Sequence, residues 1–98
     1  MDSKLPAVHP GEILREEYLV PFEIDPSQLA STLKVPSEDI DLLIKEATPI
    51  SAELALKLAK YFRTSPEFWM HMQASYDLKT QAAAMKAELD KIPEIEAA

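Results

Sequence analysis

This 98-residue chain contains eight prolines and a single glycine, and the distribution of these residues constrains its fold more than any other feature. Between the prolines, apolar residues recur every three or four positions, without a sustained alternation of β-branched and polar residues. Proline cannot continue helical hydrogen bonding, so it marks helix boundaries. Phosphate-cradling loops and tight hairpins depend on glycines, and one glycine excludes P-loops and Rossmann turns. We therefore predict an all-α domain.

The proline boundaries and the helical spacing predict five helices. Asp25, Ser37 and Thr64 have the side chains and positions of N-caps for the second, third and fifth helix. The expected ranges are 10–20, 27–33, 38–46, 52–62 and a last helix that opens at Thr64 and can continue to Pro93. The residues expected to face the core are Ile13, Leu14, Tyr18, Leu19, Leu29, Ala30, Leu33, Ile40, Leu43, Ile44, Leu54, Ala55, Leu58, Ala59, Phe62, Phe68, Trp69, Met72 and Tyr76.

The last predicted helix is too long for a small domain to cover. At 1.5 Å per residue it would reach roughly 40 Å, so part of it must project. Its second half carries apolar residues in a 4-3-4-3 pattern, a seam of two heptads that needs a partner: Leu78, Ala82, Met85, Leu89 and Ile92. We expect a flexible tail over residues 1–8, a folded domain over 9–78, an extension over 79–98, and a homodimer.

Composition narrows the functional classes. The chain has no cysteine and no apolar stretch near the length of a membrane span, which favours a cytoplasmic protein without disulfides. His71, Ser75 and Asp77 supply the residue types of a catalytic triad, but helical neighbours leave no oxyanion site. We expect His9 to cap or pack at a helix start. No residue pattern indicates an enzyme, a metal site or a cofactor.

The second and third predicted helices, joined by a tight turn at Val35 and Pro36, have the arrangement of a helix-turn-helix. Specific segments flank this pair: His9-Pro10-Gly11-Glu12-Ile13-Leu14 before it, and Thr64-Ser65-Pro66-Glu67-Phe68-Trp69 with Gln73-Ala74 and Tyr76-Asp77-Leu78 after it. With Gln28-Leu29-Ala30 and Ala55-Leu56-Lys57-Leu58-Ala59, the pattern resembles the HigA family of antitoxins, also called virulence-associated protein I, over roughly residues 8 to 79. That family belongs to the Xre-type, lambda-repressor-like helix-turn-helix superfamily.

The resemblance implies a dimeric antitoxin that blocks a basic, HigB/RelE-like mRNA-cleaving toxin and represses its own operon by binding operator DNA. It places a recognition helix directly after Val35-Pro36, with phosphate contacts from the flanking turns. Lys34 takes a position where the family often has glycine. The candidate DNA-binding residues are Gln28, Lys34, Ser37, Glu38, Asp39, Asp41, Lys45, Thr48 and Ser51.

The recognition helix departs from the family in its charge. The family usually carries Arg, Thr and Asn-type residues at its start, whereas residues 37–46 contain four acids and one lysine. Acids in a first helical turn are favoured by the helix dipole, but they repel phosphates. The formal charge of the whole chain is also negative, at −7. A second hypothesis follows: an acidic protein-binding module whose degenerate helix-turn-helix binds DNA weakly or without sequence preference.

Overall fold

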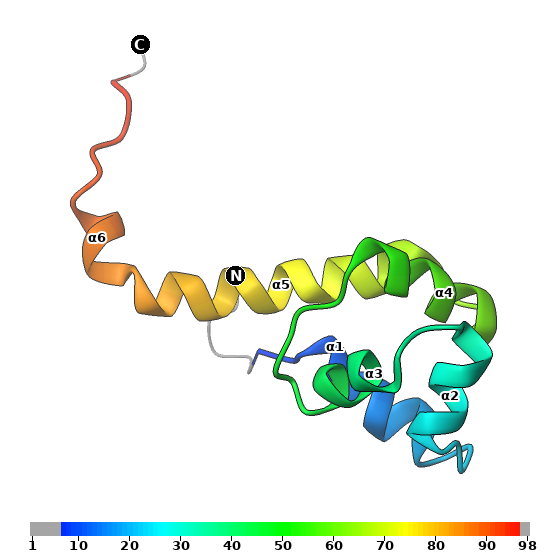
Figure 1. The fold of residues 1–98 in the computed structure, drawn as a ribbon. Coiled ribbons are helices and arrows are strands. Elements are labelled where there is room, and N and C mark those ends of the chain that lie inside the picture. The colour runs from blue at the N-terminus through cyan, green and yellow to red at the C-terminus, as the bar shows by residue number, and fades with distance from the viewer. Residues whose placement is uncertain (1–6, 97–98) are drawn as a thin grey trace.

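The structure is a computed structural model that describes residues 7–96, and every regular element in this range is a helix. Figure 1 shows a small helical domain from which the C-terminal part projects as an arm. The elements are α1 (Pro10–Ile13), a π-helix η1 (Leu14–Leu19), α2 (Pro26–Leu33), α3 (Ser37–Ile44), α4 (Ala52–Phe62), α5 (Pro66–Ala84) and α6 (Lys86–Asp90). The all-α prediction is confirmed. Helix α1 continues directly into η1, so the two correspond to the first predicted helix.

The core forms where the apolar faces of these helices meet around Trp69, whose side chain is fully buried in α5. The other large side chains that are fully buried come from η1, α2, α3 and α4: Leu14, Leu29, Ile40, Leu43 and Leu58. Each was predicted from helical spacing. Phe68 was also expected in the core, and that prediction was wrong: its side chain is 40% exposed and packs edge-on against Trp69. Ile50, in the loop before α4, belongs to the core although no helical pattern includes it.

Two predicted N-caps are shifted by one residue. Helix α3 begins at Ser37, and its N-cap is Pro36, whose backbone is extended (φ −60°, ψ 140°). Helix α5 is capped by Ser65, whose hydroxyl accepts a hydrogen bond from the Phe68 amide at 3.0 Å. The Thr64 hydroxyl instead accepts a hydrogen bond from the Trp69 indole at 2.8 Å. Asp25 caps α2 as predicted, by accepting from the Ser27 amide at 2.9 Å.

The ends of two helices also differ from prediction. Helix α3 stops at Ile44 rather than Glu46, because Glu46 adopts a left-handed conformation with a φ of 61°. The long last helix is interrupted at Met85, whose backbone (φ −104°, ψ 14°) leaves the α-helical region, and α6 turns away from the axis of α5 (Figure 1). No proline or glycine marks this break. Helix α4 spans Ala52–Phe62, as predicted.

The extension does project, as expected, and the described chain measures 55 × 24 × 22 Å along its principal axes. Most of the predicted flexible tail, residues 1–6, lies outside the described residues. None of the helices in residues 7–96 has the length and apolar character that a membrane crossing requires.

Candidate nucleic-acid interface

Helices α2 and α3 and the turn between them form a helix-turn-helix. Lys34 ends α2 in the left-handed conformation, with φ 60° and ψ 47°, at the position where the resemblance suggested a glycine. The turn is closed by a hydrogen bond from the Val35 amide to the Ala30 carbonyl at 3.0 Å, after which Pro36 leads into α3. A non-glycine residue in this conformation costs about 1 kcal/mol, which the packing of α2 against α3 offsets.

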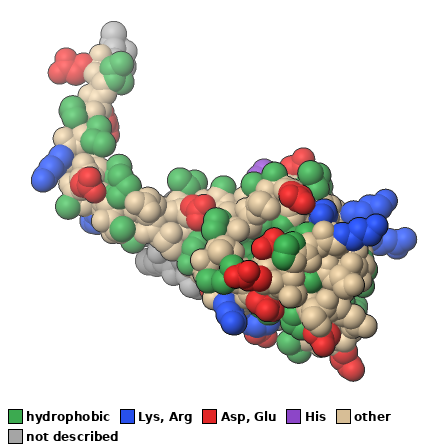
Figure 2. Space-filling model, viewed as in Figure 1, with side chains coloured by type: hydrophobic (Ala, Val, Ile, Leu, Met, Phe, Trp, Pro, Cys, Tyr) green, Lys and Arg blue, Asp and Glu red, His purple; other side chains and the backbone are tan. Residues whose placement is uncertain are grey.

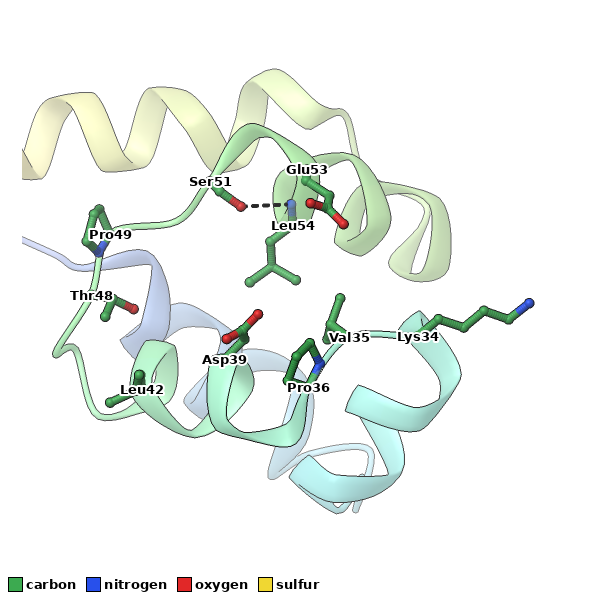
Figure 3. A pocket seen from close by; sticks show the side chains of 10 residues that line it. All are labelled: Lys34, Val35, Pro36, Asp39, Leu42, Thr48, Pro49, Ser51, Glu53 and Leu54. Carbon is green, nitrogen blue, oxygen red and sulfur yellow. Dashed lines mark hydrogen bonds between the residues drawn. The ribbon is translucent and has the colours of Figure 1, made fainter.

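Four of the nine candidate DNA-binding residues lie together. Lys34, Asp39, Thr48 and Ser51 line one pocket of about 380 Å³ between the start of α3 and the start of α4 (Figure 3). The remaining lining residues are Val35, Pro36, Leu42, Pro49, Glu53 and Leu54. The loop after α3 thus brings Thr48 and Ser51 beside the first turn of α3. From the sequence, only the order of these two segments along the chain was known. In the structure they are neighbours in space.

The other five candidates lie outside this pocket. Gln28 is exposed in the first turn of α2, and Lys45 is exposed just beyond α3. Ser37, Glu38 and Asp41 lie on exposed positions of α3. All five are accessible to a ligand. The Ser51 hydroxyl, by contrast, already accepts a hydrogen bond from the Leu54 amide at 3.1 Å as the N-cap of α4.

The electrostatics of this surface are acidic. Asp39 and Glu53 line the pocket, whereas the Lys34 side chain extends away from it (Figure 3). Lys57, one helical turn after Glu53, forms an ion pair with its carboxylate at 3.2 Å. Its ammonium also lies 3.4 Å from the Lys34 carbonyl. The nearby cations therefore either point out of the pocket or have an acidic partner, and the pocket itself presents carboxylates.

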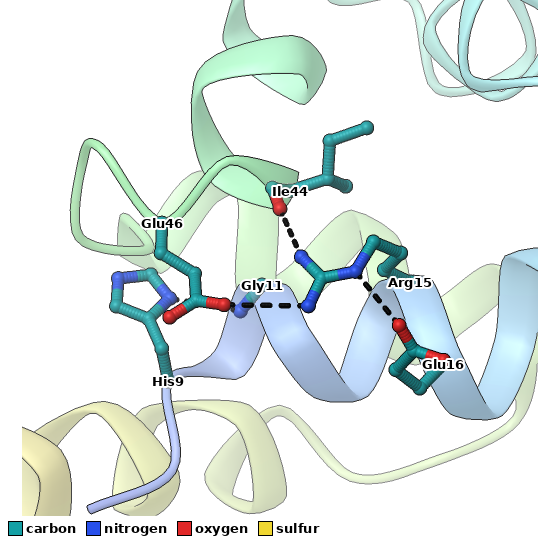
Figure 4. Close-up of polar contacts among 6 residues, drawn as sticks. All are labelled: His9, Gly11, Arg15, Glu16, Ile44 and Glu46. Carbon is teal, nitrogen blue, oxygen red and sulfur yellow. Dashed lines mark hydrogen bonds and ion pairs between the residues drawn. The ribbon is translucent and has the colours of Figure 1, made fainter.

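A junction between the first helix and the end of α3 holds the recognition helix in place. We call this the α1–α3 junction and define it by His9, Gly11, Arg15, Leu43, Ile44 and Glu46. The Arg15 guanidinium donates to the carbonyl of Ile44, the last residue of α3, and forms an ion pair with Glu46 at 3.4 Å (Figure 4). A hydrogen bond to Glu16 at 2.9 Å is the main cause that raises the pKa of Arg15 above its ordinary value.

The single glycine of the chain, Gly11, lies in this junction for a steric reason. A Cβ at this position would lie 1.8 Å from the Leu43 carbonyl oxygen, so only glycine permits the close approach of α1 to α3. The Gly11 amide donates to Nδ1 of His9 at 2.9 Å, which confirms the capping role expected for that histidine. His9 is buried and its ring packs edge-on against Tyr76 of α5, at 4.8 Å between centroids.

Gln73 fixes the loop that carries Thr48 and Ser51. Its side chain is buried in α5, and its carbonyl oxygen accepts a hydrogen bond from the Ile50 amide at 2.8 Å. The amide group of Gln73 donates to Asp77 at 2.9 Å. Asp77 therefore accepts a hydrogen bond that holds Gln73 in place. His71, which was considered with Asp77 as part of a catalytic triad, is exposed on α5. No group of three or more His, Asp or Glu side chains within residues 7–96 is arranged to hold a metal ion.

Sequence reasoning did not identify Arg15, Gly11 and Gln73 as positioning residues, because each acts on backbone far away in the chain. A glycine inside a predicted helix was the one available signal. The candidate partner-contact residues are mostly exposed, with Leu78 at 71% and Ile92 at 63%. They do not form one seam, because Leu78 and Ala82 belong to α5, Leu89 belongs to α6 and Ile92 follows it.

These features define an all-helical helix-turn-helix domain with a projecting C-terminal helix. No protein-family model matches the chain. It is 44% identical over 77 residues to virulence-associated protein I of Dichelobacter nodosus, which covers 79% of this chain and 71% of the relative. Several solved structures are similar over nearly the whole chain, including the following two. One is the Pseudomonas aeruginosa antitoxin HigA with the higBA promoter, with a TM-score of 0.88 and 41% identity over 92% of this chain and 99% of that one.

The other solved structure is an addiction module antidote protein of the HigA family from Coxiella burnetii. It has a TM-score of 0.87 and 35% identity over 94% of this chain and 100% of that one. Identity of this extent over nearly whole chains goes beyond a shared fold. The chain belongs to the HigA family of helix-turn-helix antitoxins.

Proposed function

We propose that this chain is an antitoxin that binds operator DNA through α2 and α3 and neutralises a HigB/RelE-like toxin in the cytoplasm. The observation that carries the DNA-binding part is the exposed first turn of α3, flanked by the start of α2 and by the loop with Thr48 and Ser51. Helix-turn-helix proteins present these elements to the major groove and its phosphates. The similar Pseudomonas aeruginosa HigA was solved with promoter DNA, which supports the proposal.

The acidic face of α3 determines how such binding would work. Glu38 and Asp39 oppose the phosphate field, and an acid in the groove can accept a hydrogen bond from cytosine N4. We expect a salt dependence equivalent to only about 2 to 4 phosphate contacts per protomer, because few nearby cations are available to release counterions. DNA affinity is then modest and specificity depends on cytosines opposite the carboxylates.

The test replaces Glu38 by Thr and Asp39 by Arg and measures fluorescence anisotropy on operator and scrambled duplexes at two salt concentrations. Removal of the two acids should raise non-specific affinity by about 1 to 2 kcal/mol. It should abolish discrimination if either acid contacts cytosine. Matched substitutions at exposed Glu17 of η1 and Glu67 of α5, outside α3, should leave both affinities unchanged. Tight, operator-specific binding by the original chain with a steep salt slope would refute the charge argument.

A second candidate function is that of an acidic protein-binding module whose helix-turn-helix has lost operator binding. It is favoured by one observation, the ion pair of Lys57 with Glu53, a residue that lines the pocket. Under this alternative the chain binds no duplex above the scrambled control, while toxin binding is intact. The same anisotropy measurements separate the two functions.

The toxin partner is proposed from family membership and from the charge of −7, which suits a basic protein. Co-expression with a basic, toxin-like reading frame beside the gene should yield a stable complex. In a translation assay, excess antitoxin should restore protein synthesis. Persistent toxin activity in the presence of excess antitoxin would refute neutralisation.

We also infer a homodimer that covers the exposed apolar residues of α5 and α6. Leu78, Leu89 and Ile92 are 71%, 44% and 63% exposed. Exposed apolar side chains that lie near one another favour association with another molecule. Light scattering should give the mass of a dimer. A monomer mass that persists up to about 100 μM would refute this inference.

A further inference from the structure

A second groove lies between α2 and α4, beside the candidate nucleic-acid interface, and one of its two lysines, Lys57, is paired with Glu53 at 3.2 Å. It has a volume of about 310 Å³ and is lined by Thr32, Leu33, Leu56, Lys57, Lys60 and Tyr61. Leu56 is 59% exposed and Tyr61 is 45% exposed. The groove therefore has apolar walls between two lysines. Such a surface suits an aliphatic segment that carries carboxylates.

This groove is located at the cationic end of an acidic molecule. Figure 2 shows Lys and Arg side chains gathered at the end of the domain where α2 and α4 meet, opposite the projecting arm. The Lys57 ammonium is 3.4 Å from the Lys34 carbonyl, which brings the end of α2 to this groove. A concentration of positive charge at one end contrasts with the chain's total of 10 basic and 17 acidic residues.

The opposite end of the molecule has the complementary chemistry. We define the tail segment as residues 88–96, which contain four acids and one lysine. Its aliphatic residues, Leu89, Ile92 and Ile95, recur at every third position, and Ile95 is 87% exposed. Acidic and hydrophobic side chains alternate along this part of the arm in Figure 2. After Asp90 the segment leaves the helical conformation, so its backbone can extend along a groove.

The tail segment cannot reach the groove of its own chain, because α5 carries it away from the domain (Figure 1). The two surfaces lie toward opposite ends of a molecule whose long axis measures 55 Å. A second copy would supply the missing partner. In a twofold dimer, each tail segment would reach the groove of the other copy, so both pairs form at once and the assembly closes.

We propose that the tail segment of one copy docks into the groove between α2 and α4 of a second copy. Leu89, Ile92 and Ile95 supply the aliphatic contacts, and Glu94 and Glu96 face Lys60, while Lys57 keeps its ion pair with Glu53. This proposal rests on the inferred homodimer and adds the site that each arm occupies. It assigns a role to a surface whose lining residues are not among the candidate DNA-binding residues.

A charge exchange between the two surfaces tests the docking. Lys60→Glu places like charges in the groove and the tail segment, and Glu94→Lys does the same with opposite sign. Each variant alone should dimerise about fivefold more weakly in sedimentation equilibrium. An equimolar mixture should recover the original affinity. In the mixed dimer, one groove and its docked tail carry both exchanged charges, while the other groove and tail keep both original charges.

Lys45→Glu is the matched control, since it reverses an exposed lysine of the same domain outside the groove. It should change dimerisation by less than about twofold. A synthetic peptide of residues 86–96 supplies an independent readout and should shift the amide resonances of Leu33, Leu56 and Tyr61 in the full chain. Circular dichroism checks that each variant keeps its helix content.

The outcomes separate the docking from the homodimer itself. If the chain dimerises, but Lys60→Glu behaves like Lys45→Glu and the mixture shows no recovery, the docking is wrong and the homodimer remains. If the original chain is a monomer, both the docking and the homodimer are wrong. If Lys60→Glu weakens only toxin or DNA binding, the groove belongs to that partner and the docking is overturned.

Discussion

The α1–α3 junction and the C-terminal arm, residues 78–96, belong to one short chain but are built in opposite ways. At the junction, Gly11 leaves no room for a methyl group, and Arg15 has partners on α3 and in the turn after it. Along the arm, large apolar residues such as Leu78 and Ile95 are exposed. The first region makes its contacts within the monomer, whereas the arm leaves large apolar side chains exposed to solvent. Stability and association should therefore respond to different substitutions.

The largest effect on stability is expected at Gly11. A Gly11→Ala Cβ would meet the Leu43 carbonyl oxygen at 1.8 Å, so α1 and α3 must separate. We expect a loss of about 3 kcal/mol in the free energy of unfolding, measured by urea denaturation. Glu17→Ala, on the exposed face of η1, is the control and should change it by less than about 0.5 kcal/mol. Equal midpoints for the two variants would contradict the close approach.

The next effect is expected at Gln73, which lies where α5 passes from the packed domain to the arm. Gln73→Leu leaves the buried Ile50 amide without its acceptor and should cost about 2 kcal/mol in urea denaturation. Asp77→Ala removes only the outer partner of Gln73, so it should cost less than about 1 kcal/mol. If Asp77→Ala is the more harmful change, the Gln73 contact to Ile50 does not hold the loop.

A smaller effect is expected at Arg15. Arg15→Met keeps the aliphatic stem but removes the donor to the Ile44 carbonyl and the ion pair with Glu46, which are partly exposed to solvent. We expect a loss of about 1 kcal/mol. Glu46→Gln removes the ion pair alone and should cost no more than about 0.5 kcal/mol. Similar losses for both variants would show that the carbonyl contact contributes little.

The smallest effect on monomer stability is expected in the arm. Met85→Glu combined with Leu89→Glu should change the unfolding free energy of dilute protein by less than about 0.5 kcal/mol, because neither side chain belongs to the core. The same double variant should lose its dimer in light scattering. Unchanged dimerisation would show that the arm's apolar residues have another role, and a large loss of stability would erase the contrast with the junction.

Local features of the sequence were sufficient to predict most of the fold. Helical spacing identified the buried faces, and Asp25 and the following proline located the start of α2. The limits of α4 were also predicted. The helix-turn-helix followed from the same signals and from the resemblance to HigA antitoxins. These features depend on residues within a few positions of one another, where capping and periodicity operate.

The tertiary structure alone decided the features that depend on contacts between distant segments. Arg15 reaches Ile44 across 29 positions and Gln73 reaches Ile50 across 23, and no local pattern specifies such pairs. Ser65 rather than Thr64 caps α5, and the Thr64 hydroxyl accepts a hydrogen bond from the Trp69 indole. The arm breaks at Met85 without proline or glycine, beyond the part of α5 that packs on the domain. Local preferences thus determined the helices, whereas packing between helices decided where they end and which polar groups remain free for function.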